Sequence, residues 1–318
     1  MTAPGALLRR EAVPLLVFLL LAAAPLLGFS HSHELTLMAR AMILGIAAVS
    51  LSLLVGGAGL VSLGHAASMG FGCYAVVILD AANIAEAAIV VPVAIAAAAL
   101  FSLVTGAVAI RTSGVHFIMI TLAFGQMAYF TAASLAAYGG DDGYTLYARN
   151  TVFGRDWLQD RMAFHYVCLG LLVLAWLLCR VLLASRFGRV LRAARENPQR
   201  VLAVGFNPYP FRLVAYVIAG AVGGLAGVLL ANATEFVAPA YISWQRSGEL
   251  LFMVILGGVG SLHGAILGAL AYVLLEEQLA ALTEHWRMIF GPLLILCVLF
   301  LRGGLAGLLA PRETARHG

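Results

Sequence analysis

The sequence contains no lysine, and all 19 of its basic residues are arginine. The Walker A motif needs a lysine to bind nucleotide phosphates, and Schiff-base catalysis also proceeds through a lysine amine. The absence of lysine therefore excludes both chemistries for this chain. If the protein belongs to an ATP-driven machine, another subunit has to bind the ATP.

Cysteine is scarce as well. The four cysteines are scattered, mostly inside apolar runs, and they form no C-x-x-C pair. Zinc sites and dithiol redox centres usually show such pairs. We therefore predict buried free thiols at Cys73, Cys168, Cys179 and Cys297.

The hydrolase motifs in this sequence are incomplete. His33-Glu34 lacks the second histidine of the H-E-x-x-H zinc motif, and Ser68 lacks the first glycine of G-x-S-x-G. We expect that the protein is not an enzyme. It should carry no catalytic residue, no metal and no cofactor of its own.

Charge is low throughout, with 11% charged and 62% hydrophobic residues, whereas soluble domains average about 25% and about 45–50%. Apolar runs of about 17–25 residues, long enough to cross a bilayer as helices, recur along the chain. Backbone polar groups in lipid must be satisfied internally, so these runs should be helical. The sequence predicts an all-α, polytopic integral membrane bundle of about eight to ten transmembrane helices with glycine-rich broken segments.

Ten apolar runs are candidate spans. The polar stretches between them reach only about 25 residues, too short for a separate core, so residues 1–318 should form a single transmembrane domain. The eighth and ninth runs are short and separated by glycines, so two helices or one bent segment fit them equally. The runs cover residues 13–29, 36–55, 66–82, 87–110, 115–137, 164–183, 211–231, 247–260, 263–281 and 287–302.

The placement of arginines predicts the orientation. The loop at about 184–210 is rich in arginine and holds a single acid, Glu196, whereas the loop at about 139–163 mixes arginines with aspartates. Cytoplasmic loops are enriched in basic residues. We therefore place the first loop and the N-terminus, with Arg9 and Arg10, in the cytoplasm, and the second loop outside.

The arginine-rich loop has the pattern of an amphipathic helix. Apolar residues at helical spacing alternate with arginines between Phe187 and Leu202. Asn197 suits the N-cap, Pro198 the first turn and Gly205 the stop of a second short helix. The apolar side needs a cover, and the membrane surface and a partner protein fit this pattern equally well.

Glycines crowd the stretch from Leu54 to Gly72, and each weakens a helix by roughly 1 kcal/mol relative to alanine. Irregular backbone at membrane depth is tolerated only inside protein or beside a watery cavity, and transporters often build substrate sites from broken helices. A tight turn between packed helices explains the stretch equally well. A similar glycine cluster lies between Leu256 and Gly268. Either internal duplication or coincidence explains the similarity of the two clusters.

The turn from Tyr138 to Tyr144 contains the adjacent carboxylates Asp141 and Asp142. These residues lack the spacing of an EF-hand, so a metal site is only weakly indicated. We expect instead a periplasmic turn that contacts a docking protein or shapes the mouth of a pathway.

One helical run carries two overlapping G-x-x-x-G spacings, Gly220/Gly224 and Gly223/Gly227. Such spacings let helix backbones approach each other closely in lipid. We therefore predict that these glycines serve helix packing.

Seven stretches together form a specific pattern, although each alone would not: Leu53–Gly72, Thr121–Gly125, Gly139–Gly143, Phe187–Gly205, Gly220–Gly227, Met253–Gly264 and Arg302–Gly307. In this pattern the chain resembles, nearly end to end, the LivM-type permease subunits of branched-chain amino acid ABC importers, a family that includes urea and amide transporters. The resemblance implies a single transmembrane permease domain in a bacterial inner membrane. It implies alternating-access import of a small polar nutrient, such as a branched-chain or other amino acid.

The resemblance also implies partners. These are a second, LivH-type permease subunit, two cytoplasmic ABC ATPase subunits that bind ATP and Mg²⁺, and a periplasmic solute-binding protein. The pair Asp141-Asp142 departs from the commonest family members, which leaves the transported solute open.

The family's coupling segment falls on Arg195–Gly205, which favours ATPase docking over lipid contact for this loop. The expected coupling residues are Arg192, Arg195, Glu196, Asn197, Ala203 and Gly205. The expected pathway residues are Gly56, Gly57, Gly59, Ser62, Gly64, His65, Thr121, Gly257, Gly258, Gly260 and Ser261. The expected periplasmic turn comprises Gly139, Asp141, Asp142 and Gly143.

An ion-coupled secondary transporter is the alternative class. Such transporters carry ionisable residues at mid-membrane. Here the candidates lie near predicted span ends: Arg40, Asp80, Glu86, Arg111 and Glu249. The alternative stays open because imidazoles titrate near neutral pH, and the chain has His65, His116 and His263 in or near its spans.

Overall fold

The computed structural model describes residues 4–27, 31–283, 285, 288–292, 295–296 and 303–309. Its named α-helices are α1 (Pro4–Ala23), α2 (Ser32–Ser52), α3 (His65–Ala81), α4 (Ala87–Ala109), α5 (Val115–Ser134), α6 (Arg161–Ala184), α7 (Arg186–Glu196), α8 (Pro198–Ala203), α9 (Pro208–Thr234), α10 (Trp244–Gly257), α11 (Leu262–Leu282) and α13 (Gly304–Leu309). Two short strands, β1 (Tyr144–Thr145) and β2 (Phe236–Val237), pair antiparallel. A π-helical segment, η2 (Leu53–Ala58), follows α2, and the 3-10 turns are η1 (Ala24–Leu27), η3 (Ala136–Tyr138), η4 (Trp157–Gln159) and η5 (Pro239–Ile242).

Six of these helices are long and apolar enough to cross a membrane, namely α2, α4, α5, α6, α9 and α11, and α1 and α3 are shorter apolar helices. The predicted all-α, multi-pass fold is therefore confirmed. The predicted eighth and ninth spans are two separate helices, α10 and α11, that pack against each other. The tenth predicted span lies largely outside the described residues.

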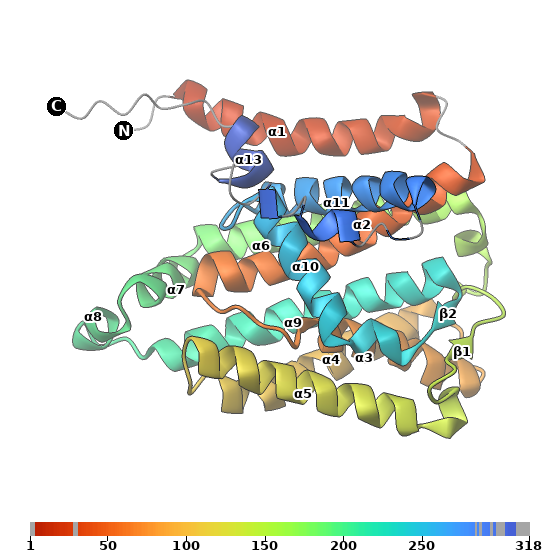
Figure 1. The fold of residues 1–318 in the computed structure, drawn as a ribbon, viewed down its shortest axis with the longest axis horizontal. Helices are drawn as coiled ribbons and strands as arrows, with labels where there is room; N and C mark the ends of the chain where they lie inside the picture. The colour runs from red at the N-terminus through yellow and green to blue at the C-terminus, as the bar shows by residue number, and fades with distance from the viewer. Residues whose placement is uncertain are drawn as a thin grey trace.

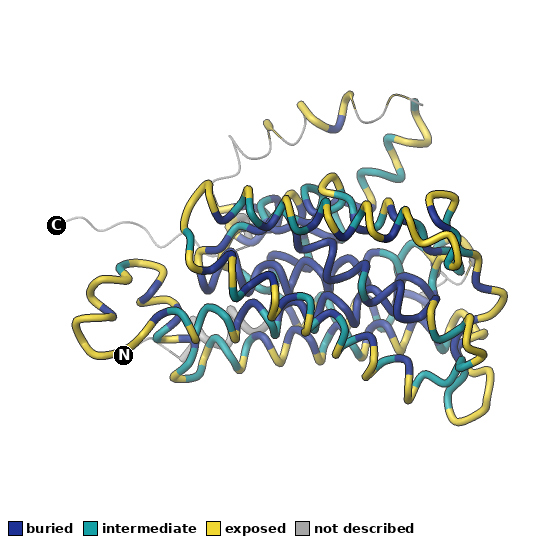
Figure 2. Tube along the Cα trace, turned by 90° about the horizontal axis from the view of Figure 1, so that it is seen from below, coloured by how far each residue is buried: buried dark blue, intermediate teal, exposed yellow. Residues whose placement is uncertain are grey.

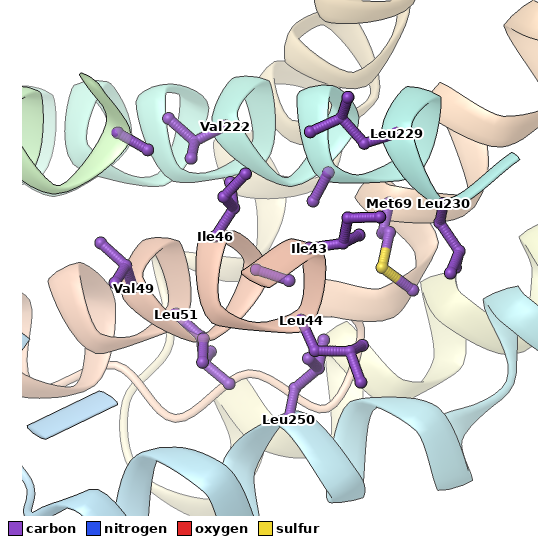
Figure 3. Packing of buried hydrophobic residues seen from close by; sticks show 14 of the residues in the cluster. Ile43, Leu44, Ile46, Val49, Leu51, Met69, Val222, Leu229, Leu230 and Leu250 are labelled. Atoms are coloured by element: carbon purple, nitrogen blue, oxygen red, sulfur yellow. The ribbon is translucent and has the colours of Figure 1, made fainter. Parts of the chain in front are cut away.

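Helix α2 is the centre of the bundle (Figure 1). It packs against α6, α9, α10 and α11, and every residue of its apolar stretch is buried. Its sequence explains this position, because a helix that is hydrophobic on all sides has no face for water. Figure 3 shows Ile43, Ile46 and Val49 of α2 packed toward α9, with Leu44 facing Leu250 of α10.

The paired glycines of α9 pack against two different helices. Gly220 and Gly224 lie against α4, whereas Gly223 and Gly227 lie against α3. A Cβ atom added to Gly227 would come within 1.9 Å of the carbonyl oxygen of Met69, a backbone atom that cannot rotate away. The predicted packing role of the two G-x-x-x-G spacings is confirmed.

The outer helices expose apolar side chains, as expected of a surface that faces lipid. Leu100 and Val104 of α4, Met119 and Phe130 of α5, and Leu174 of α6 are all exposed. Figure 2 shows the buried residues at the centre of the bundle and exposed residues along its edges and ends. Such apolar outer faces require a bilayer as their solvent.

The bundle has two different ends (Figure 1). Helices α7 and α8 project at one end, called here the α7 end. The β1–β2 pair and the segment of residues 135–160 lie at the other end, called here the β end. The two predicted loops, 184–210 and 139–163, therefore lie at opposite ends of the bundle.

Three cysteines, Cys73, Cys168 and Cys179, are buried free thiols, as predicted. They lie on α3 and α6, inside the helical bundle. Cys297 lies outside the described residues.

Candidate translocation core and coupling contacts

The chain breaks between α2 and α3, as the glycine-rich stretch predicts. The α-helical hydrogen bonding of α2 ends at Ser52, and the chain continues as the π-helical η2. This segment stops at Gly59, which has a left-handed backbone with φ of +70°. Residues 59–64 are not helical, yet Ser62 and Gly64 are buried. The hydroxyl of Thr121 accepts a hydrogen bond from the amide of Leu63 at 3.3 Å, so part of this irregular backbone is satisfied by protein.

Helices α3 and α10 both begin inside the bundle, and their first turns meet. The amide of Ala66, in the first turn of α3, donates to Oγ of Ser247, in the first turn of α10, at 3.0 Å. From this point α3 runs to the β end, where Tyr144 donates to Asp80 near its last turn. Helix α10 runs to the α7 end, where the turn after it meets Gly56. Two half-helices thus diverge from one polar contact, which sequence reasoning missed.

His65, predicted to line the pathway, lies in the core of this chain with an exposed fraction of 2%. Its Nε2 lies 2.7 Å from Oγ of Ser50. Because the Ser50 hydroxyl donates to the carbonyl of Ala47, the imidazole N–H is the donor to Ser50. A second pair, Ser68 and Ser102, joins α3 to α4 at 3.0 Å. These contacts fix the start of α3.

The two glycine clusters of the sequence meet at the α7 end. A Cβ atom on Gly56 would lie 2.7 Å from Cα of Gly260, and one on Gly257 would lie 1.9 Å from the carbonyl oxygen of Gly264. Ser261 caps α11 by accepting from the amide of Gly264 at 3.1 Å. The two glycine clusters differ in structure. The cluster after α2 leads into the half-helix α3, whereas the cluster after α10 forms the turn between α10 and α11.

The structure thus divides the predicted pathway residues into two groups. One group lies around the turn at the α7 end and comprises Gly56, Gly57, Gly59, Gly257, Gly258, Gly260 and Ser261. The other group lies deeper, around the start of α3, and comprises Ser62, Gly64, His65 and Thr121.

Helix α7 packs on the bundle of its own chain, which corrects both interpretations of its apolar face. Leu191 and Ala194 have no exposed surface, because α7 packs against η2, α6 and α9. Neither lipid nor a partner protein covers this face. The buried side of α7 serves to fix the helix to its own chain.

Two predicted coupling arginines have different surroundings. The guanidinium of Arg195 donates to the carbonyl oxygen of Gly56 in η2, and its aliphatic stem packs against Gly59. Arg192 donates to the carbonyl oxygen of Leu183, a nearby residue of α6, at 2.8 Å. Arg195 therefore connects α7 to the broken segment, whereas Arg192 caps the preceding helix.

Helix α8 has the capping that its sequence predicts. Oδ1 of Asn197 accepts from the amide of Arg200 at 3.0 Å, and Gly205 has a φ of +90° just beyond the helix. Glu196 and Ala203 are exposed. Sequence reasoning did not single out the apolar residues exposed at this tip, which are Leu202, Val204 and Phe206.

Two ionisable residues placed near span ends in fact lie within the bundle. Arg40 is in the third turn of α2, and Nη2 of Arg40 contacts both carboxylate oxygens of Glu276 on α11 at 2.9 Å. Glu249 belongs to α10, which begins inside the bundle, and it pairs with Arg246 at 2.6 Å. Arg40 and Glu249 are thus each paired with a side chain of opposite charge, as low-dielectric surroundings require.

The glycine turn at the β end is compact. Gly139 and Gly143 have φ values of +90° and +86°, and the amide of Gly143 donates to the carbonyl of Gly139 at 3.2 Å. Gly143 packs under the ring of Phe236 in β2. Asp141 and Asp142 are exposed, and no group of His, Cys, Asp or Glu suited to a metal ion occurs in the described part of the chain.

The loop beside this turn is held by Glu86, which directly precedes α4. Its carboxylate accepts from the amides of Phe153 at 2.7 Å and Gly154 at 3.1 Å, and from the hydroxyl of Thr151 at 3.2 Å. The Phe153 and Gly154 amides hold the pKa of Glu86 below its usual range. Phe153 has a φ of +52°, rare for a non-glycine residue, so the clamp supports a strained loop tip.

We expect Glu86→Ala to release this loop. Because the carboxylate's pKa is depressed, its contribution is present at neutral pH and is lost as pH falls through the folded-state pKa. The protection factors of the Phe153 and Gly154 amides, that is, the exchange rates of the unstructured chain divided by their own at the same pH, should fall about tenfold in the variant at pH 7, and in the native chain only under acid conditions. Asp142→Ala, which removes an exposed carboxylate nearby, is the control. Unchanged exchange in Glu86→Ala would contradict the clamp.

The chain is a multi-pass bundle built around two half-helices, α3 and α10, whose first turns meet inside it. This is the architecture of a membrane transport permease. Residues 35–299 match the family described as branched-chain amino acid transport system / permease component, and the chain belongs to this family. It is therefore a transmembrane transport permease and not an enzyme.

Individual relatives agree with this assignment. The chain is 27% identical over 300 residues to the high-affinity branched-chain amino acid transport system permease protein LivM of Escherichia coli, covering 87% of this chain and 71% of that protein. It is 32% identical over 125 residues to the permease protein LivH of the same organism, covering 39% and 40%. A nucleoside ABC transporter permease, NupC of Lactococcus lactis, matches 26% of the chain at 32% identity, over 25% of its own length. No solved structure matches.

Proposed function

We propose that this chain is one of two permease subunits of an ATP-driven ABC importer, and that it moves branched-chain or other amino acids by alternating access. The family match over residues 35–299 is the observation that carries this proposal. The relatives named LivM and LivH support a core of two homologous permeases. In this proposal the α7 end and the N-terminus face the cytoplasm of a bacterium and the β end faces the periplasm, consistent with the arginines around α7.

In this proposal the energy comes from two cytoplasmic ATPase subunits, which bind the ATP and Mg²⁺. The contact between Arg195 and Gly56 supports such a route, because it links the arginine-rich loop to η2. Segment η2 in turn meets the α10–α11 turn at Gly260. A movement of α7 would therefore reach both half-helices through contacts between rigid elements.

A periplasmic solute-binding protein would dock at the β end. Three aromatic side chains there are exposed, namely Tyr147, Phe153 and Trp157. Exposed aromatics are enriched in protein interfaces, and the clamp at Glu86 holds Phe153 outward. The glycine turn with Asp141 and Asp142 lies at the same end.

Purification of the tagged chain from its native membranes in mild detergent tests the proposal. Mass spectrometry should find a P-loop ATPase and a second permease at stoichiometric amounts, and vesicles containing the complex should take up labelled leucine only with ATP. Recovery of the chain alone, under conditions that preserve other ABC complexes, would favour an ion-coupled transporter instead.

The exposed apolar tip at α8 should form the centre of the ATPase contact. We expect Val204→Asp to reduce co-purification of the ATPase about tenfold or more, because a charge in the desolvated centre of an interface costs at least about 1–2 kcal/mol. Gln199→Asp, on the exposed surface of the same helix, is the matched control and should lose less than about twofold. Equal losses in the two variants would place the contact elsewhere.

A further inference from the structure

One loop at the β end, residues 144–154 and called here the β-end loop, contacts the ends of three helices. Tyr144 donates to Asp80 in the last turn of α3 at 3.1 Å, and the clamp at Glu86 joins the loop to the start of α4. Strand β1 of the loop pairs with β2, which begins just beyond the end of α9. The exposed ring of Phe153 belongs to the same loop. A partner that binds this loop therefore acts on all three helices.

A buried pair of side-chain amides joins the β-end loop to α9. The backbone amide of Asn150 donates to Oδ1 of Asn232, in the last turn of α9, at 2.7 Å. In return, Nδ2 of Asn232 donates to Oδ1 of Asn150 at 2.7 Å and to the carbonyl oxygen of Val228 at 2.8 Å. Nδ2 of Asn150 donates to the carbonyl oxygen of Ala85, just before α4, at 3.1 Å. Because both asparagines are buried, separating them would leave polar groups unpaired, so the loop and α9 move together.

The three helices below this loop are packed backbone against backbone. A Cβ atom on Gly72 of α3 would lie 2.1 Å from the carbonyl oxygen of Gly224 in α9. A Cβ atom on Gly224 would in turn lie 2.5 Å from Cβ of Ala98 in α4. Helices in such close contact have no room to slide past one another. Helices α3, α4 and α9 therefore form one rigid unit, called here the α9 block.

The α9 block is bonded to α7 at its other end. Figure 1 shows α9 running the length of the bundle, from α8 to the β1–β2 pair. Near its start, Nη2 of Arg212 donates to the carbonyl oxygen of Ala194 in α7 at 2.8 Å. At 1.5 Å per residue, Arg212 and Asn232 are about 30 Å apart along the same helix. A single helix thus joins the β-end loop to the arginine-rich segment at the opposite end.

We propose that Asn150, Asn232 and Arg212 are positioning residues that transmit docking of the binding protein from the β-end loop to α7. Under the proposed function, on which this rests, a solute-binding protein docks at the β end and α8 contacts the ATPase. Docking shifts the loop, the α9 block moves with it as a rigid body, and Arg212 displaces α7. ATP hydrolysis is thereby stimulated. This route is separate from the contact of Arg195 with Gly56, which joins α7 to the broken segment.

ATP hydrolysis by the complete reconstituted complex, with and without binding protein that carries its solute, tests this proposal. Asn232→Ala should reduce the maximal stimulation by the binding protein about fivefold, since one lost hydrogen bond shifts an equilibrium by about this factor. Hydrolysis without the binding protein should stay within about twofold of native, because the ATPase contact is distant. The clamp at Glu86 and the β1–β2 pairing remain, so the half-saturating concentration of binding protein should also stay within about twofold.

Two further variants separate transmission from docking and from stability. Thr234→Ala removes a hydroxyl at the same end of α9 that donates to the carbonyls of Leu230 and Phe236, and it should leave the stimulation unchanged. Trp157→Ala removes an exposed ring beside the loop. It should raise the half-saturating concentration of binding protein without lowering the maximal stimulation.

Arg212→Met tests the other end of the same route, because methionine removes the donor to Ala194. This variant should also lower the maximal stimulation about fivefold. The double variant Asn232→Ala/Arg212→Met should lose no more than the stronger single variant. Sites about 30 Å apart normally have additive effects, so this non-additivity is specific to a shared route.

Additive losses in the double variant would overturn the proposal, and so would normal stimulation in either single variant or an equal loss in Thr234→Ala. A native complex that takes up solute with ATP, but whose hydrolysis does not respond to the binding protein, would overturn it as well. A native complex without any ATP-driven uptake would instead overturn the proposed function itself, and this route with it.

Discussion

Replacing Gly227 with alanine is expected to destabilise the permease by about 3 kcal/mol or more, enough to remove most of the folded protein from the membrane. The added methyl would lie 1.9 Å from the carbonyl oxygen of Met69 and 2.9 Å from the amide nitrogen of Cys73. Both are backbone atoms of α3, so relief requires α3 and α9 to move apart. That movement would also separate Ala66 from Ser247, because both contacts depend on the position of α3.

Gly170 provides the matched control, because it lies in the spanning helix α6 and has no atom within 4 Å of an added Cβ. Gly170→Ala should be neutral or should stabilise the helix by up to about 1 kcal/mol through helix propensity. Yield after purification and the thermal midpoint in detergent measure both variants. A Gly227→Ala variant as stable as Gly170→Ala would show that the close packing of α3 on α9 is not required.

The fold could be predicted from sequence largely because the membrane restricts the possibilities. Apolar length alone located α4, α5, α6, α9 and α11 to within a few residues, since lipid permits only helices there. The spacing of Gly223 and Gly227 was sufficient to predict close packing, although not which helix they touch. Length could not show that α10 begins inside the bundle, because its start depends on the cap at Ser243 and on contact with α3.

The candidate site was less predictable, because its contacts join residues far apart in the sequence. Ser247 satisfies the amide of Ala66, 181 residues away, and nothing in the local sequence indicates this contact. Arg40 was placed at a span end because the apolar run begins close to it, whereas α2 extends further and pairs Arg40 with Glu276. By contrast, the cap at Asn197 was predictable because it requires only residues three positions away.

The sequence correctly predicted that α7 is amphipathic, but it did not predict what covers the apolar face of the helix. An apolar helix face in a loop shows only that something covers it, and here the cover is η2, α6 and α9 of the same chain. This arrangement changes the roles expected of the arginines. Substitutions at Arg192 and at Arg195 should therefore have different effects, because only Arg195 contacts the broken segment.

We therefore expect Arg195→Met to uncouple the importer. Methionine keeps an apolar stem against Gly59 but removes every donor to the carbonyl of Gly56. A charged hydrogen bond contributes about 1.5–3 kcal/mol, and 1.4 kcal/mol corresponds to a factor of ten. Uptake by the reconstituted complex should fall about tenfold or more, while the complex still assembles and hydrolyses ATP.

Arg192→Met is the matched control for this prediction, because it removes the same functional group one turn earlier on α7. Its uptake should stay within about twofold of the native complex, since Arg192 only satisfies a carbonyl at the end of α6. Arg195→Lys should recover part of the uptake, because an ammonium on a long stem can still donate to Gly56. Equal loss in Arg195→Met and Arg192→Met would show that the loop responds to its net charge. Loss in Arg195→Met alone, with ATP hydrolysis maintained, requires that α7 acts on the half-helices through η2.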